Sequence, residues 1–168
     1  MHELVWPSVV VAIVAFVLRS VLFASRFVDD GALVGHLKKL LLAQNVDRAG
    51  KLLEAADRTI LGGSLRALFL RSRQDGEVEA WRRAFDETFA RRARPLVVTA
   101  PIVIVLFLLA CAMVLGDAVD REKLDPAPLV ALGVTLLVFS TSTIRAEVRM
   151  FRRAKKNRDA FVHALQSA

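Results

Sequence analysis

The side chains that most often carry out catalysis or bind metals are few and widely separated in this sequence. None of the three histidines, His2, His36 and His163, has a second histidine, a cysteine or an acidic residue at metal-ligand spacing. The single cysteine, Cys111, lies in an apolar stretch and has no partner for a disulfide within the chain. Gly62-Gly63-Ser64 lacks the lysine and the spacing of a phosphate-binding loop. These residues predict no enzyme activity, no metal site and no cofactor.

The charged residues instead follow a pattern that indicates a membrane protein. Of the 168 residues, 55% are hydrophobic, which is high for a soluble domain. Leu96 to Gly116 contains no charge, and roughly 20 apolar residues of helix suffice to cross a bilayer. The basic stretch Arg91–Arg94 precedes it and the acidic stretch Asp117–Asp120 follows it. Because basic flanks stay in the cytoplasm, we expect Leu96 at the cytoplasmic face and Gly116 at the outer face.

A second candidate span runs from Leu4 to Ala24, with Arg19 as its only charge. We expect this arginine to extend toward the lipid headgroups near the downstream end of the span. A cleaved signal peptide is the alternative, but such a peptide begins with basic residues. Residues 1–3 contain no lysine or arginine, whereas Arg19 and Arg26 lie within and after the apolar core. The pattern favours a retained helix with its N-terminus outside the cell.

A third candidate span runs from Pro126 to Ile144 and ends in a cluster of hydroxyl side chains. The connector 117–125 before it has a net charge of −2, which suits the outer face. The tail Arg145–Ala168 has a net charge of +5 and is predicted to be a cytoplasmic helix. Its basic residues are expected to attract anionic lipids by about 1 kcal/mol for each nearby charge.

The predicted fold is therefore all-α, with three transmembrane helices and a cytoplasmic helical insert. The spans are residues 1–24 and the hairpin 96–144, and the insert is 25–95, which carries a net charge of +4. Basic segments inside and an acidic loop outside account for the overall charge of +7. The sequence therefore predicts membrane lipids, and no nucleic acid, as partners of the basic residues. The predicted location is the bacterial inner membrane, with a cytoplasmic C-terminus.

The first part of the insert is predicted to be a pair of short antiparallel helices. Asp29 or Asp30 can cap a helix that carries Leu33, Leu37, Leu40 and Leu41 on one face. Asn45 is expected to end it, and Asp47 to cap the next helix.

The second part of the insert is predicted to be divided by glycines. Gly62-Gly63-Ser64 is expected to break the helical pattern before 65–73, and 74–76 to break it again. A longer helix is predicted from Glu77. A kink or a fresh start is expected at Pro95 and a bend near Pro101, with Thr99 among the groups that bond the freed carbonyls.

This layout resembles the MotA/TolQ/ExbB proton-channel family over nearly the whole chain: one span, a helical cytoplasmic insert, a two-span hairpin and a cytoplasmic tail. Residues 37–57 are similar to the cytoplasmic helix pair of the family, whose helices are joined by a short turn. Asn45-Val46-Asp47-Arg48-Ala49 stands at that turn. The resemblance implies an inner-membrane subunit that couples proton-motive force to transport or mechanical work.

The resemblance further implies partners and site residues. Several copies, commonly five, would surround a pore that encloses a single-span partner of the ExbD/TolR/MotB type, whose membrane aspartate carries the proton. Hydroxyls can hydrogen-bond such a carboxylate or its water without titrating. The implied pore-lining residues are Thr99, Thr135, Ser140, Thr141 and Thr143. The implied partner interface is the charged face that includes Arg82, Asp86 and Arg91.

Four other interpretations remain open. The hydroxyl residues can serve helix packing by bonding their own backbone. The charged face of 75–92 can be solvated and stabilised by pairs at helical spacing. The whole chain can be a non-conducting membrane scaffold that recruits partners through its cytoplasmic helices, or, less favoured, a small transporter component.

Overall fold

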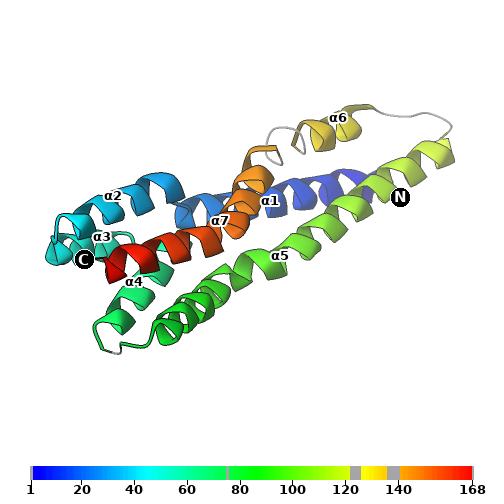
Figure 1. Cartoon of the computed structure of the whole chain (residues 1–168). Helices are drawn as coiled ribbons and strands as arrows, with labels where there is room; N and C mark the ends of the chain where they lie inside the picture. The colour runs from blue at the N-terminus through cyan, green and yellow to red at the C-terminus, as the bar shows by residue number, and fades with distance from the viewer. Residues whose placement is uncertain (1, 75, 122–125, 136–140, 168) are drawn as a thin grey trace. The chain divides into compact units, whose positions relative to one another are not determined.

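A computed structural model describes residues 2–74, 76–121, 126–135 and 141–167, without side chains at 2, 30, 120, 121 and 141–144. The described part contains helices and turns and no strand, as the all-α prediction requires. Figure 1 labels its seven helices. Their bounds are α1 His2–Arg26, α2 Asp30–Leu42, α3 Val46–Ala55, α4 Ile60–Ser72, α5 Val78–Arg121, α6 Pro126–Thr135 and α7 Thr141–Gln166.

The chain divides into two compact units. Unit 1 comprises Met1–Ala24 and Pro95–Glu147, and unit 2 comprises Ser25–Arg94 and Val148–Ala168. Three helices, α1, α5 and α7, contribute residues to both units. The predicted assignment of 1–24 and 96–144 to the membrane and of the remainder to the cytoplasm stays a prediction.

The α2–α3 hairpin of unit 2 is defined at both ends by its own side chains and backbone. Asp29 caps α2, because its Oδ1 accepts hydrogen bonds from the amides of Gly31 and Ala32 at 3.0 and 3.3 Å. At the other end, the amide of Gln44 donates to the carbonyl of Leu41, and the amide of Asn45 donates to that of Leu40, each at 2.8 Å. These two bonds form a Schellman motif.

Two predicted end residues of this hairpin are wrong by one or two positions. Gln44, with φ of 55°, is the left-handed residue that ends α2, a place for which we expected Asn45. Asn45 is the N-cap residue of α3, and Asp47 lies in the first turn of that helix instead of capping it. The reason is that two backbone hydrogen bonds, and not the residue most tolerant of a left-handed conformation, fix where α2 ends.

The predicted break at Gly62-Gly63-Ser64 is also wrong, because these residues lie inside α4 and are buried. The helix begins after Thr59, whose hydroxyl oxygen accepts from the amide of Gly62 at 3.1 Å. A Cβ atom on Gly62 would lie 2.3 Å from the carbonyl oxygen of Ala56, and one on Gly63 would lie 2.3 Å from Cζ of Arg92. Glycine is present here for close packing and not for a chain break.

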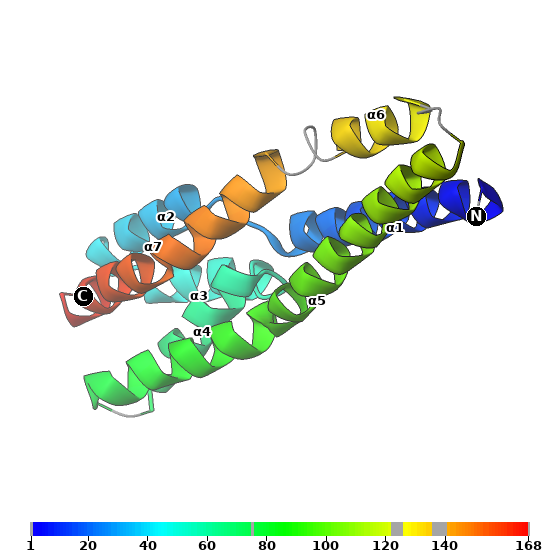
Figure 2. The same ribbon diagram turned by 90° about the vertical axis from the view of Figure 1, so that its right-hand side faces the viewer.

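Unit 2 has a hydrophobic core to which all of its helices contribute. In Figures 1 and 2 the C-terminal part of α7 lies beside α2 and α3. The start of α5 after residues 74–76 agrees with the prediction, and its Trp81 and Phe85 are buried. A fully buried leucine or phenylalanine contributes about 1.5–3 kcal/mol. The core residues with no exposed surface are Leu37, Leu41, Ala49, Leu53, Leu65, Leu68 and Phe161.

Unit 1 is built from α1, the second half of α5, α6 and the start of α7. Its smaller apolar cluster includes Val9 and Ala12 of α1, Ala110 and Val114 of α5, and Leu132 of α6. Phe16 and Phe107 meet edge to face, with their ring centroids 6.3 Å apart.

Helix α5 continues without interruption through Pro95 and Pro101, so a fresh start, one of the two alternatives predicted at Pro95, does not occur. The alternative kink at Pro95 and the bend near Pro101 stay predictions. It also includes 117–121, which we expected in a connector. The third predicted span is described as α6, residues 126–135, followed by α7 from residue 141, and 136–140 lie outside the described residues.

Two helical stretches of the described chain are long and apolar enough to cross a membrane, judged by length and composition. One lies within Glu3–Leu42, a stretch that includes α1 from Glu3 onward and α2, and the other lies within Val78–Val119 of α5. Within the chain, only 17% of the most apolar stretch of α5 is buried. Soluble monomers rarely leave so long an apolar surface uncovered.

Candidate functional site

The most unusual group in unit 1 is a buried ion pair between α1 and α7. A single terminal nitrogen of Arg19, Nη2, donates to both carboxylate oxygens of Glu147, at 2.7 and 2.9 Å. The arginine side chain is 8% exposed and the glutamate side chain 13% exposed. Charges so shielded from water persist only when they are paired.

This geometry corrects the expectation that Arg19 extends toward lipid headgroups. Its guanidinium points to Glu147, 128 residues further along the chain, and lies 3.5 Å from the carbonyl oxygen of Leu96 on α5. Its Nε is also buried and has no hydrogen-bond partner among the described residues. Arg19 thus links three helices of unit 1 through one side chain.

The chemistry of the pair follows from the fixed charge of arginine. A guanidinium stays protonated at any physiological pH, so the opposing carboxylate balances a permanent positive charge. Replacing Glu147 by a neutral residue would leave that charge buried and unpaired. The pair is therefore suited to holding α1 and α7 together at one register.

The hydroxyls predicted to line a pore bond the backbone of their own helices where the structure describes them. Thr99 donates to the carbonyl oxygen of Pro95 at 2.7 Å, and Thr135 to that of Ala131 at 2.8 Å. We had expected Thr99 to bond a carbonyl freed by a proline. Pro101 leaves the carbonyl of Val97 without an amide donor, but Thr99 bonds the carbonyl of Pro95 instead. The side chains of Ser140, Thr141 and Thr143 lie outside the described residues. Pore lining stays a prediction for all five.

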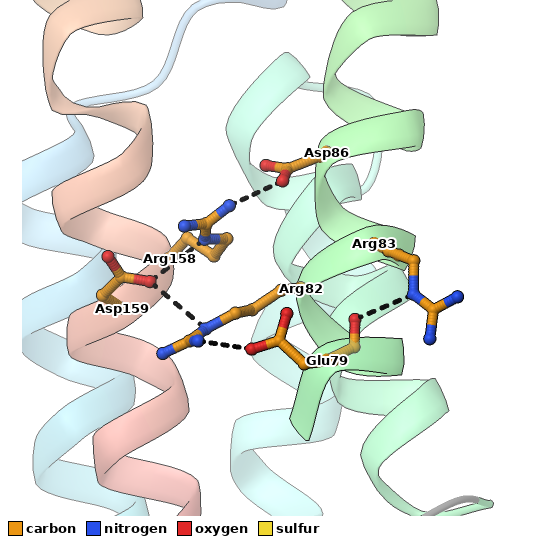
Figure 3. A network of polar contacts seen from close by, with 6 residues as sticks. All are labelled: Glu79, Arg82, Arg83, Asp86, Arg158 and Asp159. Atoms are coloured by element: carbon orange, nitrogen blue, oxygen red, sulfur yellow. Dashed lines mark hydrogen bonds and ion pairs between the residues drawn. The ribbon is translucent and has the colours of Figure 1, made fainter. Parts of the chain in front are cut away.

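The predicted partner interface in unit 2 is drawn in Figure 3, where charged residues of α5 meet those of α7. Asp86 accepts a 2.6 Å hydrogen bond from Nη1 of Arg158. Arg82 donates to Glu79 one turn earlier at 2.7 Å, and its Nε lies 3.7 Å from Oδ1 of Asp159. Asp159 also accepts from Nε of Arg158 at 3.1 Å.

Two of the three predicted interface residues therefore have partners within the chain. Arg82 and Asp86 bridge to α7, whereas Arg91 is exposed and forms no ion pair with a described side chain. Nearby, Phe89 of α5 and Phe151 of α7 meet edge to face with ring centroids 5.6 Å apart. The contact of this face with another protein stays a prediction.

Arg158 is the group whose protonation is most affected by these contacts. Burial by itself would lower the pKa of its guanidinium, but the hydrogen bonds and charges of Asp159 and Asp86 outweigh burial, and the net pKa lies above the ordinary value. Its side chain is 12% exposed. Arg158 thus remains a cation and fixes two carboxylates of unit 2.

No group of three histidine, cysteine or acidic side chains suited to a metal ion occurs among the described residues. Cys111 is a free thiol beside the apolar cluster of unit 1.

Sequence reasoning missed the role of Glu147. The available signal was complementarity: Arg19 is the only charge in residues 4–24, and Glu147 is the only acidic residue in the basic stretch 145–158. Two isolated opposite charges next to predicted spans could have been paired on that ground.

Comparison with models of known protein families, with curated proteins and with solved structures gives no match.

Proposed function

We propose that this chain is an oligomeric membrane subunit of the MotA/TolQ/ExbB type, which couples proton-motive force to transport or mechanical work together with a single-span partner. Its location would be the bacterial inner membrane, with three spans, an outer N-terminus and a cytoplasmic C-terminus. Unit 1 would lie in the bilayer, and unit 2 in the cytoplasm.

The observation that carries the proposal is the apolar surface of α5. Four of its exposed apolar residues repeat at intervals of four and three, which places them on one stripe of the helix. This stripe can pack against lipid or against α5 of another copy. Its members are Val98, Ile102, Val105 and Leu109, all more than half exposed.

The continuity of α5 supports the coupling part of the proposal. One helix of 44 residues includes both the charged segment that bridges to α7 and the apolar segment of unit 1. A displacement at one end of a continuous helix is carried along it, which is what a subunit linking ion flow to work requires. The proton-carrying carboxylate would belong to the partner, and the hydroxyls of the second and third spans would form the stationary wall of the pore.

The assembly is tested by co-expressing the chain with a single-span protein that has an aspartate in its span. The complex is purified in nanodiscs, its mass is measured, and it is imaged. We expect a ring of several copies, five by the resemblance, around the partner. A clean monomer, with and without the partner, would overturn the proposal.

A non-conducting scaffold is the second candidate, and the described polar groups of unit 1 favour it. Thr99 and Thr135 donate to their own helices, and the carboxylate of Glu147 is paired with Arg19. The proton of each hydroxyl and the charge of the carboxylate are thus already engaged within the chain.

The two candidates differ in their response to removal of hydroxyls. Thr99→Val and Thr141→Val should abolish gradient-dependent activity if these residues line a pore. Valine keeps the shape of threonine and loses only its hydrogen bond. The stability of each variant is measured as well, so that unfolding is not mistaken for loss of the pore. Full activity in stable variants would favour the scaffold.

A further inference from the structure

Unit 2 contains a shallow cavity of about 260 Å³ that is lined mainly by arginine. Arg26 is the last residue of α1, Arg58 lies in the turn before α4, and Arg92 lies on α5. The fourth lining residue is Ile60, the first residue of α4. No hydrogen bond or ion pair joins Arg26 or Arg58 to another side chain in the described part of the chain. Two of the three guanidinium groups are thus available to an anion.

The third arginine is held rigidly in place. Arg92 donates from Nη1 to the carbonyl oxygen of Asp57 and from Nη2 to its Oδ1, the latter at 3.1 Å. Its guanidinium also packs directly on Gly63, where a side chain would collide with it. A group fixed before binding loses little freedom when a ligand arrives. The cavity therefore has a prearranged wall.

The balance of charge around the cavity is positive. Three guanidinium groups line it. The carboxylate that pairs with Arg92, Asp57, is also paired with Arg66, which lies 3.3 Å from its other oxygen. The N-terminal end of α4, at Ile60, adds the positive end of a helix dipole. Guanidinium groups match the oxygens of a phosphate in geometry as well as charge. The chemistry of the cavity suits a phosphate group.

The positions of these arginines in the sequence indicate the source of the phosphate. Arg26 follows the apolar stretch 4–24 by two residues, and Arg92 precedes the apolar stretch 96–116 by four. Residues so close to the ends of membrane-spanning segments lie at the level of the lipid headgroups, where basic cavities bind anionic lipids. We propose that the cavity binds the phosphate of an anionic phospholipid. The proposal rests on membrane insertion of α1 and α5, and not on proton coupling.

The test uses the full-length protein with phosphatidylglycerol as the probe. Protein from nanodiscs of equimolar phosphatidylcholine and phosphatidylglycerol is analysed by native mass spectrometry for retained lipid, and short-chain phosphatidylglycerol is titrated in detergent. Arg26→Gln and Arg58→Gln should each weaken phosphatidylglycerol binding about tenfold, because each removes a charge-assisted hydrogen bond. The matched control is Arg94→Gln, which removes an exposed charge two residues from Arg92 but outside the cavity. It should change binding by less than about twofold.

Three outcomes would overturn the proposal. Wild-type protein that retains no phosphatidylglycerol has no lipid site. Equal weakening by all three variants would mean general attraction to an anionic surface. Displacement of the lipid by inorganic phosphate at matching concentration would mean a site for the free anion. A monomer that binds phosphatidylglycerol in the cavity would contradict the proposed ring-forming function but not the cavity proposal. A ring without bound lipid would contradict the cavity proposal but not the ring-forming function.

Discussion

Arg19–Glu147 in unit 1 and Arg158–Asp86 in unit 2 join the same kinds of charged groups in different surroundings. The carboxylate of Glu147 is 13% exposed and that of Asp86 is 54% exposed. Arg158 has a second carboxylate partner in Asp159, whereas the only described side chain that pairs with Arg19 is Glu147. Water can therefore take the place of Asp86 in unit 2, whereas both side chains of the pair in unit 1 are largely shielded from it.

The burial of apolar residues differs between the two units in the opposite direction to the burial of charge. Unit 2 encloses its large apolar residues in a core shared by five helices, and unit 1 leaves much of α1 and α5 exposed. Unit 1 thus has buried charge and exposed apolar surface, which is the arrangement expected of a protein whose solvent is lipid. Unit 2 has the arrangement expected in water.

The largest effect should come from breaking the buried pair. Glu147→Gln leaves the Arg19 guanidinium without a counter-charge, and we expect a loss of about 3–5 kcal/mol of stability. The measurement is thermal unfolding of the protein in nanodiscs.

The matched control for this variant is the double substitution Arg19→Gln with Glu147→Gln. It removes both charges and should recover most of the loss. A double variant as unstable as Glu147→Gln alone would mean that the unpaired charge of Arg19 is not the cause of the loss.

A smaller effect should follow from disturbing the close packing of α4 in unit 2. Gly62→Ala brings Cβ against the backbone of Ala56, which cannot move aside, and should cost about 1–3 kcal/mol. Gly63→Ala meets the guanidinium end of the Arg92 side chain, which can move only by giving up its hydrogen bonds to Asp57, and should cost less than a collision with backbone. Chemical unfolding of both variants checks the order, and a larger loss for Gly63→Ala would contradict it.

These glycines show why the sequence alone misplaced the break in unit 2. Two adjacent glycines indicate a turn by local propensity, whereas their role here depends on the Ala56 backbone and on Arg92, 29 residues further along. Local signals did predict the start of α2 at Asp29 and the start of α5 after 74–76. Helix ends that depend on neighbouring residues could be predicted, and the role of the two glycines, which depends on distant contacts, could not.

The next effect should be a gain of stability in the α2–α3 hairpin. Gln44 has a positive φ, which costs a residue with a side chain about 1 kcal/mol relative to glycine. Gln44→Gly should therefore stabilise the protein by up to that amount, as a rise in the midpoint of chemical unfolding. A destabilised variant would mean that the Gln44 side chain makes a contribution greater than the backbone strain.

The smallest effect should come from the exposed counterpart of the buried pair. Asp86→Asn removes one carboxylate from Arg158, which keeps Asp159, and should cost less than about 1 kcal/mol. The same unfolding assay measures it. A cost equal to that of Glu147→Gln would remove the distinction between the two units.

The candidate site was predicted only in part, because the partners of its residues could not be known from the sequence. Thr99 and Thr135 were recognisable as polar residues in apolar stretches, but their bonds to their own helices could not be known from the sequence. Arg19 was recognisable as an isolated charge, and its partner was not, because the two residues are 128 positions apart. The charged face at Arg82 and Asp86 was recognised, and its bridges to α7 were not.

The central claim, that lipid surrounds unit 1 and water surrounds unit 2, is tested most directly by comparing two leucines. Leu108 of α5 is 64% exposed and Leu42 of α2 is 63% exposed, so the chain itself shields them equally. Leu108→Cys and Leu42→Cys are each made in a Cys111→Ala background, and their reaction with a membrane-impermeant maleimide is followed in nanodiscs. We expect Leu42→Cys to react rapidly and Leu108→Cys to react only after the protein is denatured. Equal rates in the intact nanodisc would contradict the account.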